Sequence, residues 1–253
     1  LRISCQLFLY HIKNPLLVGE NKFCPGCGHS LLNKIIADVL VENGWADKTI
    51  TALCIGCALN VTHYVNWDLV QSPHGRAAAV ATGIKHMQKD KLVYSYQGDG
   101  DAAGIGLAET FHAASRGEAF TQIMVNNQIY GMTGGQSSCT TLIGQRTTTS
   151  GPAGRDPLKT GYPTKLAEII AMVDAAGYVA RVSLHDPVHI RQTKKVLEKA
   201  FRLQLEENKY SFIEVLAMCP TNFHVEPWDA PDYMVKNVLP VFPLGEFKTP
   251  DGR

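Results

Sequence analysis

The sequence predicts an α/β fold in which a parallel sheet carries helices on both of its faces. Short apolar strand patterns alternate with helix patterns along most of the chain, which is typical of parallel sheets. The composition agrees, because 45% hydrophobic and 19% charged residues describe a globular chain. A length of 253 residues suits one large domain or two small ones.

The predicted elements follow one another in a regular order. The helices are amphipathic or alanine-rich and cover 30–43, 75–88, 107–115, 166–175 and 187–207. The strands are short and apolar and cover 50–53, 91–96, 122–126, 179–183 and 212–217. The segment 134–163 is polar and rich in Gly and Thr, and the tail from Thr221 is rich in Pro and aromatic residues. Because long irregular segments usually serve a ligand or a partner, we expect both to contact partner chains.

Charge and hydropathy exclude several classes of protein. A net charge of +1 does not favour binding to nucleic acid or to a membrane surface. No apolar run reaches the roughly 18 residues that a membrane-spanning helix needs. The start of the chain lacks an initiator Met and a small-residue cleavage site, so we interpret residues 1–22 as an extension rather than a signal peptide. The expected location is the cytoplasm.

A glycine-rich turn follows the predicted strand 91–96. Gly98, Gly100 and Ala103 fit the dinucleotide-binding pattern G-x-G-x-x-A, in which backbone N–H groups approach a phosphate at a helix N-terminus. That fold also needs an acidic residue at the end of the next strand, where this chain has Asn126 followed by a second asparagine. The pattern therefore indicates a phosphate site of another kind.

Asp99 lies inside this turn, where its charge would repel a bare diphosphate. A divalent cation removes the conflict, since the carboxylate then binds the metal and the metal binds the phosphate oxygens. Right-handed β-α-β connections make the two strands parallel, so Asp99 and Asn127 should lie at the same edge of the sheet. A Gly-Asp-Gly turn, a spacer of 25 residues (101–125) and an Asn-Asn pair resemble thiamin-diphosphate enzymes. The resemblance implies that Asp99, Asn127 and the backbone carbonyl of Ile129 bind Mg²⁺; the alternative is two turns that serve only the fold.

The cysteines indicate metal or redox chemistry. Seven cysteines are an odd number in a long chain, which does not favour a secreted disulfide framework. Cys24 and Cys27 form one C-x-x-C motif, and Cys54 and Cys57 form another. The two motifs together are typical of a zinc site. An iron–sulfur cluster also needs four thiolates, although not necessarily these four.

Further motifs resemble the β subunits of 2-oxoacid:ferredoxin oxidoreductases. They are CPGCGH, IGC, HGRAAAVATGIK, YQGDGD, VNNQIYGMTGGQ, TTLIGQ, VSLHDP and a CPT after the last strand, and the likeness runs from about Phe23 to Lys248. It implies a [4Fe–4S] cluster bound by Cys24, Cys27, Cys57 and Cys219. Cys54 is then spare, unless it replaces Cys219 or belongs to a zinc site, and Cys5 and Cys139 are ordinary thiols.

The same resemblance assigns residues to the thiamin diphosphate site. The positions that match are Ile55, Gly56, Cys57, Ala58, His74, Gly100, Asp101, Gly131 and Met132. We add Thr133 as a hydroxyl beside the metal loop, with turn capping as the alternative. His74 could instead bond only to backbone at a helix start, and Arg76 could pair with a phosphate or with a carboxylate of a partner.

The resemblance also implies an activity and partners. The domains would be the extension 1–22, a thiamin-diphosphate and iron–sulfur domain at 23–220, and an irregular tail at 221–253 that contacts a partner. The reaction would convert a 2-oxoacid and coenzyme A into acyl-CoA and CO₂, with electrons passing through the cluster to ferredoxin. The segment 57–61 carries no cation, which favours a branched-chain substrate such as 2-oxoisovalerate over 2-oxoglutarate. Two further functions fit some of these motifs, those of a non-redox thiamin enzyme and of a zinc-binding structural subunit.

One α/β unit can hold only one end of thiamin diphosphate. The aminopyrimidine end and its activating glutamate should therefore come from an α subunit. The chain has one full set of cluster ligands and no ferredoxin-like segment, so electrons should leave through ferredoxin or a polyferredoxin δ subunit, with a γ subunit as a further partner.

Overall fold

One mostly parallel sheet forms the centre of the molecule. The computed structural model describes residues 14–251, so residues 1–13, which include Cys5, lie outside the described part. The sheet has the strand order β2-β1-β3-β4-β8-β7-β9, and only the pair β7 and β9 is antiparallel. Its strands are β1 (Thr49–Leu53), β2 (Asp68–Gln71), β3 (Leu92–Gly98), β4 (Thr121–Asn126), β7 (Ala176–Ser183), β8 (Tyr210–Leu216) and β9 (Gly245–Lys248). A separate small hairpin pairs β5 (Ile129–Tyr130) with β6 (Gln136–Ser137).

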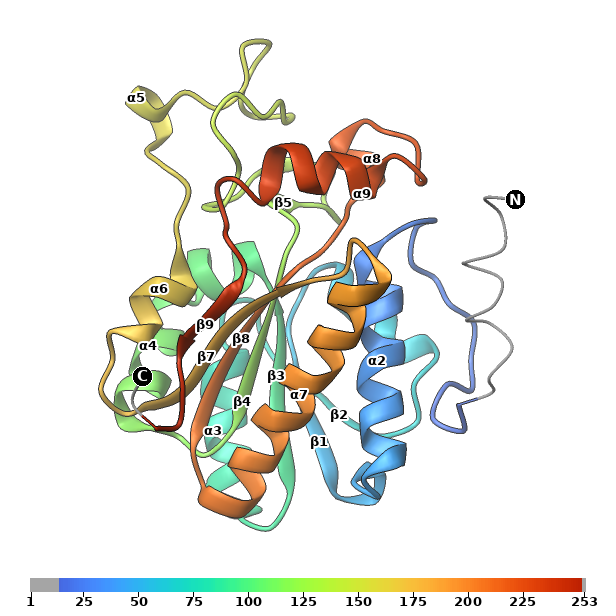
Figure 1. Ribbon diagram of the computed structural model, residues 1–253, viewed down its shortest axis with the longest axis vertical. Coiled ribbons are helices and arrows are strands. Elements are labelled where there is room, and N and C mark those ends of the chain that lie inside the picture. Colours follow the sequence, from blue (N-terminus) through green and yellow to red (C-terminus); the bar gives the residue numbers. More distant parts are fainter. Residues whose placement is uncertain (1–13, 252–253) are drawn as a thin grey trace.

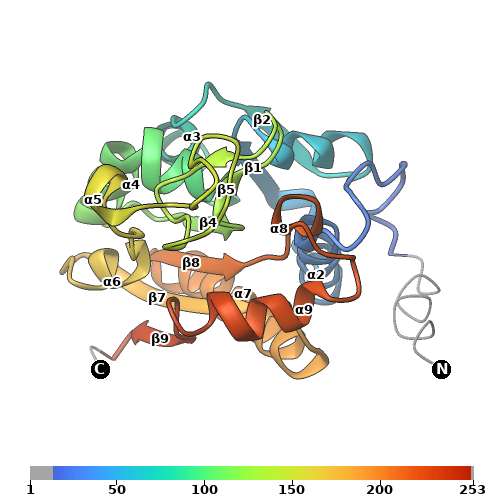
Figure 2. The ribbon, with the colours of Figure 1, turned by 90° about the horizontal axis from the view of Figure 1, so that it is seen from above.

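Helices cover both faces of this sheet, as the alternation of patterns predicts. On one face lie α2 (Gly28–Glu42) and α7 (Pro187–Glu207), and on the other lie α3 (Ala77–Met87) and α4 (Leu107–Arg116) (Figures 1 and 2). The shorter helical segments are η1 (Ala46–Lys48), η2 (Cys57–His63), η3 (Gly100–Ile105), α5 (Pro157–Thr160), α6 (Leu166–Ala171), α8 (Pro220–Phe223), α9 (Ala230–Tyr233) and η4 (Met234–Val238). The predicted fold class is confirmed.

The central strands have no solvent-facing side, which explains their composition. Every residue of β4 and β8 is buried, and so is all of β3 except its last glycine. Strands covered on both faces read as nearly continuous apolar runs, and this is how the sequence predicted them. The main exception is a buried ion pair, in which Arg181 Nε lies 2.9 Å from Glu214 Oε2. Glu214 also accepts a 2.7 Å hydrogen bond from Asn126 Nδ2, so the pair connects the sheet interior to the end of β4.

The C-terminal tail is more regular than predicted. Instead of an irregular segment, 221–253 contributes α9, η4 and the antiparallel edge strand β9. The reason is burial, because Ala230, Met234, Val238 and Phe242 are fully covered by the rest of the chain. The edge strand β2 was also missed, since its four residues are mostly exposed and lack the apolar pattern of a central strand.

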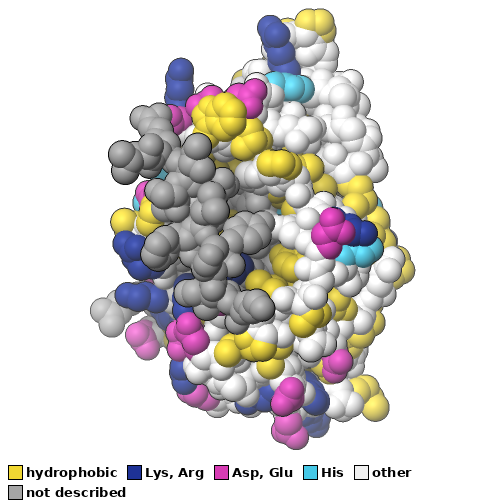
Figure 3. Space-filling view, turned by 90° about the vertical axis from the view of Figure 1, so that its right-hand side faces the viewer, with side chains coloured by type: hydrophobic (Ala, Val, Ile, Leu, Met, Phe, Trp, Pro, Cys, Tyr) yellow, Lys and Arg dark blue, Asp and Glu magenta, His cyan; other side chains and the backbone are white. Residues whose placement is uncertain are grey.

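The topology gathers several loops at one edge of the sheet. The segments that follow β1, β3, β4 and β8 all leave from the carboxyl ends of parallel strands, where ligands of such folds bind. On the face shown in Figure 3, acidic and basic side chains are interspersed, in keeping with the net charge of +1. No helix in the described residues is long and apolar enough to span a membrane.

Candidate active site

The glycine turn after β3 brings Asp99 to the start of a tightly packed helical segment. Asp99 is the residue before η3, whose backbone forms a π-helical turn of a kind often found at functional sites. A side chain at Gly100 would not fit, because a Cβ there would lie 2.2 Å from the Tyr130 ring. The Tyr130 hydroxyl donates a 3.0 Å hydrogen bond to the Gly100 carbonyl oxygen. The turn after β3 thus packs tightly against the loop after β4.

The three predicted magnesium ligands converge. One atom of the Asn127 carboxamide lies 2.9 Å from the Ile129 carbonyl oxygen and 3.0 Å from Asp99 Oδ1. The Asn127 carboxamide can adopt two orientations. In one, this atom is the amide nitrogen, which donates a hydrogen bond to each of the two oxygens. In the other, it is the amide oxygen, and three oxygens then face one another with no proton between them. Such a group is stable around a cation, and its edges match the roughly 3.0 Å between neighbouring oxygens of octahedral Mg²⁺ at about 2.1 Å.

Hydroxyl groups from a distant loop complete the surroundings of Asp99. Burial raises the pKa of the Asp99 carboxyl to about 6, while hydrogen bonds from Ser138 and Thr140 act in the opposite direction. Thr140 Oγ1 donates directly to Asp99 Oδ2. A carboxylate with a raised pKa in a buried site is one that a cation would strongly stabilise. Thr140 belongs to the TTLIGQ motif, but no role was predicted for it from the sequence.

Thr133, the hydroxyl predicted to lie beside the metal loop, bonds within its own turn. Its Oγ1 donates a 2.6 Å hydrogen bond to Gln136 Oε1 in the exposed turn between β5 and β6. The hydroxyl beside the metal loop is that of Thr140. Met132, next in the same turn, is 47% exposed and faces away from the core.

Asp101 organises the loop before α3 instead of joining the three converging oxygens. Its Oδ1 accepts a hydrogen bond from His74 Nδ1 and another, of 2.7 Å, from the Gly75 amide. Its Oδ2 accepts a 2.6 Å bond from Gln97 Nε2. His74 therefore lies beside the glycine turn, with about a third of its side chain exposed. Arg76 pairs with Glu109 of the same chain at 2.7 Å, a contact that was not considered from sequence.

Four cysteines gather at the same edge of the sheet. Burial raises the pKa of the Cys57 thiol to about 11, and the neighbouring Cys219 and Cys24 raise it further. Burial likewise raises the pKa of Cys27, and that residue is also affected by Cys219, Cys57 and Cys24. Four thiolates this close to one another are unfavourable unless a cationic centre binds them.

The second C-x-x-C motif does not contribute both of its cysteines to this group. Cys54 is buried, and its Sγ donates to the Ile55 carbonyl oxygen at 3.2 Å. Burial raises its pKa, and the next largest influence comes from Asp101, on the thiamin-site side. Sulfurs of a tetrahedral zinc site would be about 3.8 Å apart. Among the described residues no three cysteine sulfurs lie within 4.8 Å of one another.

The cysteine group and the oxygen group share one loop. A Cβ added at Gly131 would lie 3.3 Å from Cys57 Sγ and 3.9 Å from Cys219 Sγ, and Gly131 is only two residues beyond Ile129. The loop after β1 holds Ile55, Gly56 and Ala58 beside it; a Cβ at Gly56 would meet no atom within 4 Å. Asn222 Nδ2 donates a 3.2 Å hydrogen bond to Cys219 Sγ. The arrangement can therefore place a phosphate-bound metal and a thiolate-bound metal group within one compact site.

Arg155 holds the long polar segment in a defined shape. Its side chain is buried and donates to six backbone carbonyl oxygens, those of Ser138, Cys139, Thr141, Thr160, Gly161 and Tyr162. This is how a segment without a helix or strand pattern presents Thr140 to Asp99. The sequence alone did not single out this arginine, because the segment carries two, Arg146 and Arg155, among its Gly and Thr residues.

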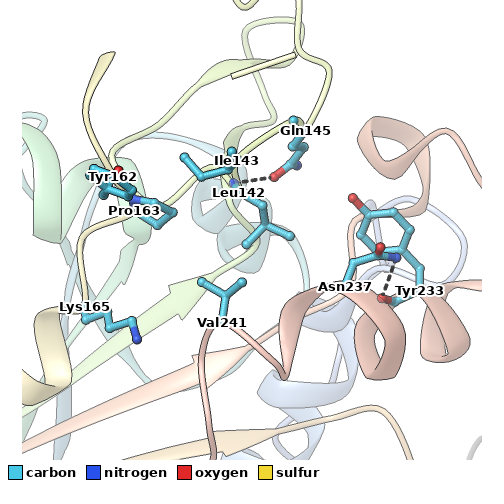
Figure 4. A pocket seen from close by; sticks show the side chains of 10 residues that line it. Leu142, Ile143, Gln145, Tyr162, Pro163, Lys165, Tyr233, Asn237 and Val241 are labelled. Atoms are coloured by element: carbon cyan, nitrogen blue, oxygen red, sulfur yellow. Dashed lines mark hydrogen bonds between the residues drawn. The ribbon is translucent and has the colours of Figure 1, made fainter. Parts of the chain in front are cut away.

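The two segments predicted to contact partners face each other across a cavity of about 430 Å³. Leu142, Gln145 and Lys165 line one side, while Tyr233 and Val241 of the tail line the other (Figure 4). The cavity is separate from the oxygen and cysteine groups. Contact with a partner remains a prediction.

Comparisons with known proteins agree with the geometry. The family model of the thiamine pyrophosphate enzyme C-terminal TPP binding domain matches residues 52–215. The ketoisovalerate oxidoreductase subunit VorA of Methanothermobacter thermautotrophicus is 41% identical over 226 residues, which cover 89% of this chain and 47% of VorA. The 2-oxoglutarate synthase subunit KorB of Archaeoglobus fulgidus is 34% identical over 215 residues, which cover 85% of this chain and 76% of KorB.

A solved structure shows the same fold. The 2-oxoglutarate:ferredoxin oxidoreductase from Magnetococcus marinus superposes with a TM-score of 0.74 at 24% identity, covering 89% of this chain and 73% of that one. The chain spans about half the length of the VorA relatives that it matches.

Proposed function

Since the chain belongs to the thiamin-diphosphate-binding subunits of the 2-oxoacid:ferredoxin oxidoreductases, we propose that it is the β subunit of such an enzyme. The reaction is the oxidation of a 2-oxoacid with coenzyme A to acyl-CoA and CO₂, with ferredoxin as electron acceptor. One observation carries the proposal. The Gly131 loop joins three converging oxygens, suited to Mg²⁺, to four cysteines, suited to an iron–sulfur group.

The residues around Asp99 would hold thiamin diphosphate by its phosphates. Thiamin supplies an electron sink that allows a 2-oxoacid to lose CO₂. Asp99, Asn127 and the Ile129 carbonyl bind the Mg²⁺, and the glycine turn lets backbone N–H groups approach the diphosphate. Asp101 fixes His74 at the rim, where the ring borders the site together with Ile55, Gly56, Ala58 and the 131–133 turn.

Cys24, Cys27, Cys57 and Cys219 would bind a [4Fe–4S] cluster. Such a cluster accepts one electron at a time, often at very negative potential. These cysteines come from the start of α2, the loop after β1 and the segment after β8, so the cluster would form only once the sheet is assembled. Cys57 also lies in the thiamin loop, which gives electrons a short path out of the site.

A branched-chain 2-oxoacid is our first choice of substrate. The loop 57–61 carries no cation for a second carboxylate, and a similar relative is named a ketoisovalerate oxidoreductase. The 2-oxoglutarate alternative has about equal support, because another similar relative is named a 2-oxoglutarate synthase. The ratio of kcat/KM for the two substrates, measured on the complete enzyme, decides between them.

The chain would act only within a larger assembly. It provides one α/β unit, so an α subunit would supply the aminopyrimidine side of the thiamin site and its activating glutamate. Ferredoxin, or a polyferredoxin δ subunit, would take the electrons, and a γ subunit is a further expected partner. Free cysteines that would bind a cluster fit the reducing cytoplasm.

The test is 2-oxoacid oxidation with coenzyme A and a viologen dye under anaerobic conditions. We expect turnover when the chain is combined with its α subunit and at most trace turnover when the chain is alone. Full activity of the chain alone would contradict the shared site. No activity in the assembled complex, with cluster and thiamin both bound, would contradict the proposed reaction.

A further inference from the structure

Two histidines and an aspartate meet at the junction between β7 and α7, away from the candidate active site. His185, Asp186 and His189 each offer one ligand atom, and these atoms all lie within 4.8 Å of one another. Within residues 14–251 they form the one such group of three histidine, cysteine or carboxylate side chains. Neither the proposed thiamin site nor the cysteine group uses them.

A single carboxylate oxygen is the centre of the group. His189 Nδ1 lies 2.8 Å and His185 Nε2 lies 3.3 Å from Asp186 Oδ2. The two rings lie close together, with centroids 4.2 Å apart and an angle of 33° between their planes. Ligand atoms of a tetrahedral zinc ion are about 3.3 Å apart. One of the two spacings already has this value, and the other has to open by only about half an ångström.

The other oxygen of Asp186 has a separate role. Asp186 is the N-cap of α7, and its Oδ1 accepts a 2.8 Å hydrogen bond from the His189 amide. Because the cap uses Oδ1, Oδ2 remains available to a metal ion without loss of the cap.

The buried histidine is oriented as a metal ligand would be. Only 6% of the His185 side chain is exposed, and its Nε2 is the ring nitrogen aimed into the group. Its Nδ1 is 2.8 Å from Ser183 Oγ, a fully buried hydroxyl at the end of β7. Ligating histidines characteristically use their second ring nitrogen in this way. Burial, and then the neighbouring His189, lower the pKa of His185.

The site is open on one side. Asp186 is 37% and His189 29% exposed at the side chain, so water can reach the centre of the group. In the sheet, β7 is two strands from β4, which at about 4.8 Å per strand places this group roughly 10 Å from the strand leading to Asn127.

We propose that His185 Nε2, Asp186 Oδ2 and His189 Nδ1 form a binding site for a divalent transition-metal ion such as Zn²⁺, with water as the fourth ligand. The two nitrogens and one carboxylate oxygen suit zinc rather than Mg²⁺, which prefers oxygen ligands. The bound ion fixes the end of β7 to the first turn of α7. It is independent of the proposed activity.

The experiment is equilibrium dialysis of the full chain against micromolar Zn²⁺, followed by measurement of zinc per chain. Cysteines also bind zinc, but they do so equally in every variant, so the difference between variants isolates this site. We expect His189→Ala and Asp186→Asn each to bind one zinc ion fewer than the wild type. Asn is as good an N-cap as Asp, so Asp186→Asn removes the ligand while keeping the cap.

Two further variants calibrate the result. His86→Ala is the matched control, because His86 also pairs with a carboxylate, Glu118, at 2.7 Å but has no second histidine, and it should bind as much zinc as the wild type. Ser183→Ala should keep the ligands but weaken zinc binding by roughly 10- to 100-fold. Equal zinc in the wild type, His189→Ala and Asp186→Asn, with all three folded by circular dichroism, would overturn the proposal.

Discussion

The two halves of the candidate site differ in how far the protein itself satisfies their polar groups. On the carboxylate side, Asp101 accepts hydrogen bonds from His74, Gly75 and Gln97, and Asp99 is bonded to Thr140 and faces the Asn127 carboxamide. On the cysteine side, the thiols lie close enough together that Cys219 and Cys24 raise the pKa of both Cys27 and Cys57. The carboxylate side should hold its shape without a cofactor, whereas the cysteine side should depend on one.

The largest effect should follow from the loss of a cluster ligand. Cys219→Ala leaves three thiolates, so we expect no cluster and a fall in activity of the complete enzyme by more than roughly 100-fold. Iron per chain and absorbance near 400 nm measure this. Cys54→Ala is the matched control, because Cys54 is a buried thiol outside the group, and it should retain iron. The reverse pattern would favour a site built from both C-x-x-C motifs.

Asp99→Asn should weaken cofactor binding while leaving the fold intact. It removes the one charged ligand at the diphosphate end, a loss of about 3 kcal/mol or roughly 100-fold in the affinity for thiamin diphosphate with Mg²⁺. Calorimetry measures the affinity, and a thermal unfolding midpoint near that of the wild type shows that the fold is retained. Unchanged affinity would disprove the metal assignment.

The raised pKa of Asp99 gives two opposite pH trends. Its pKa is about 6 in the folded chain against an ordinary 3.8, so the folded state binds the proton more tightly than the unfolded state. The contribution of Asp99 to stability without cofactor is therefore fully present below pH 3.8 and is lost as the pH rises through 6. Cofactor binding changes in the other direction, since protons compete with Mg²⁺ below about pH 6. The stability without cofactor and the affinity for thiamin diphosphate with Mg²⁺ should each be measured at pH 5 and at pH 7. Both trends should appear in the wild type, and neither should appear in Asp99→Asn.

Arg155 connects the polar segment to the carboxylate side. Arg155→Gln removes most of the bonds to the carbonyl oxygens that this side chain satisfies, and we expect a loss of about 2–3 kcal/mol in the free energy of unfolding. Thr140 should then be held less firmly, so the affinity for Mg²⁺ with thiamin diphosphate should also fall. Arg146→Gln, an exposed arginine of the same segment, should change neither quantity. Equal effects of the two substitutions would contradict the role of Arg155.

The smallest expected effect separates two threonines. Thr140→Val removes a hydrogen bond to the Asp99 carboxylate, which should cost about 1–2 kcal/mol, or roughly tenfold in Mg²⁺-dependent thiamin diphosphate affinity. Thr133→Val removes only a bond in an exposed turn and should have little effect. A larger loss of affinity in Thr133→Val than in Thr140→Val would support Thr133, the residue predicted from the sequence.

Local patterns predicted the sheet, and the resemblance supplied the proposed ligands, but neither predicted what surrounds those ligands. The buried strands were visible because they are continuous apolar runs, and Asp99 and Asn127 because parallel strands end at one edge. Thr133 was proposed because it is near the metal loop in sequence, whereas Thr140 was missed because it is bonded to Asp99 across 41 positions. The tail was predicted to be irregular because it is rich in Pro and aromatic residues, and burial against the rest of the chain stabilises its short helices.

The most direct test of the proposed function is the metal content of the chain purified without oxygen. The cysteine geometry predicts about four iron atoms and four sulfides per chain, no zinc at the cysteines, and a brown colour that is lost in Cys219→Ala and kept in Cys54→Ala. Stoichiometric zinc at the cysteines, with neither iron nor sulfide, would contradict the electron-transfer role and leave a structural metal site beside the thiamin fold.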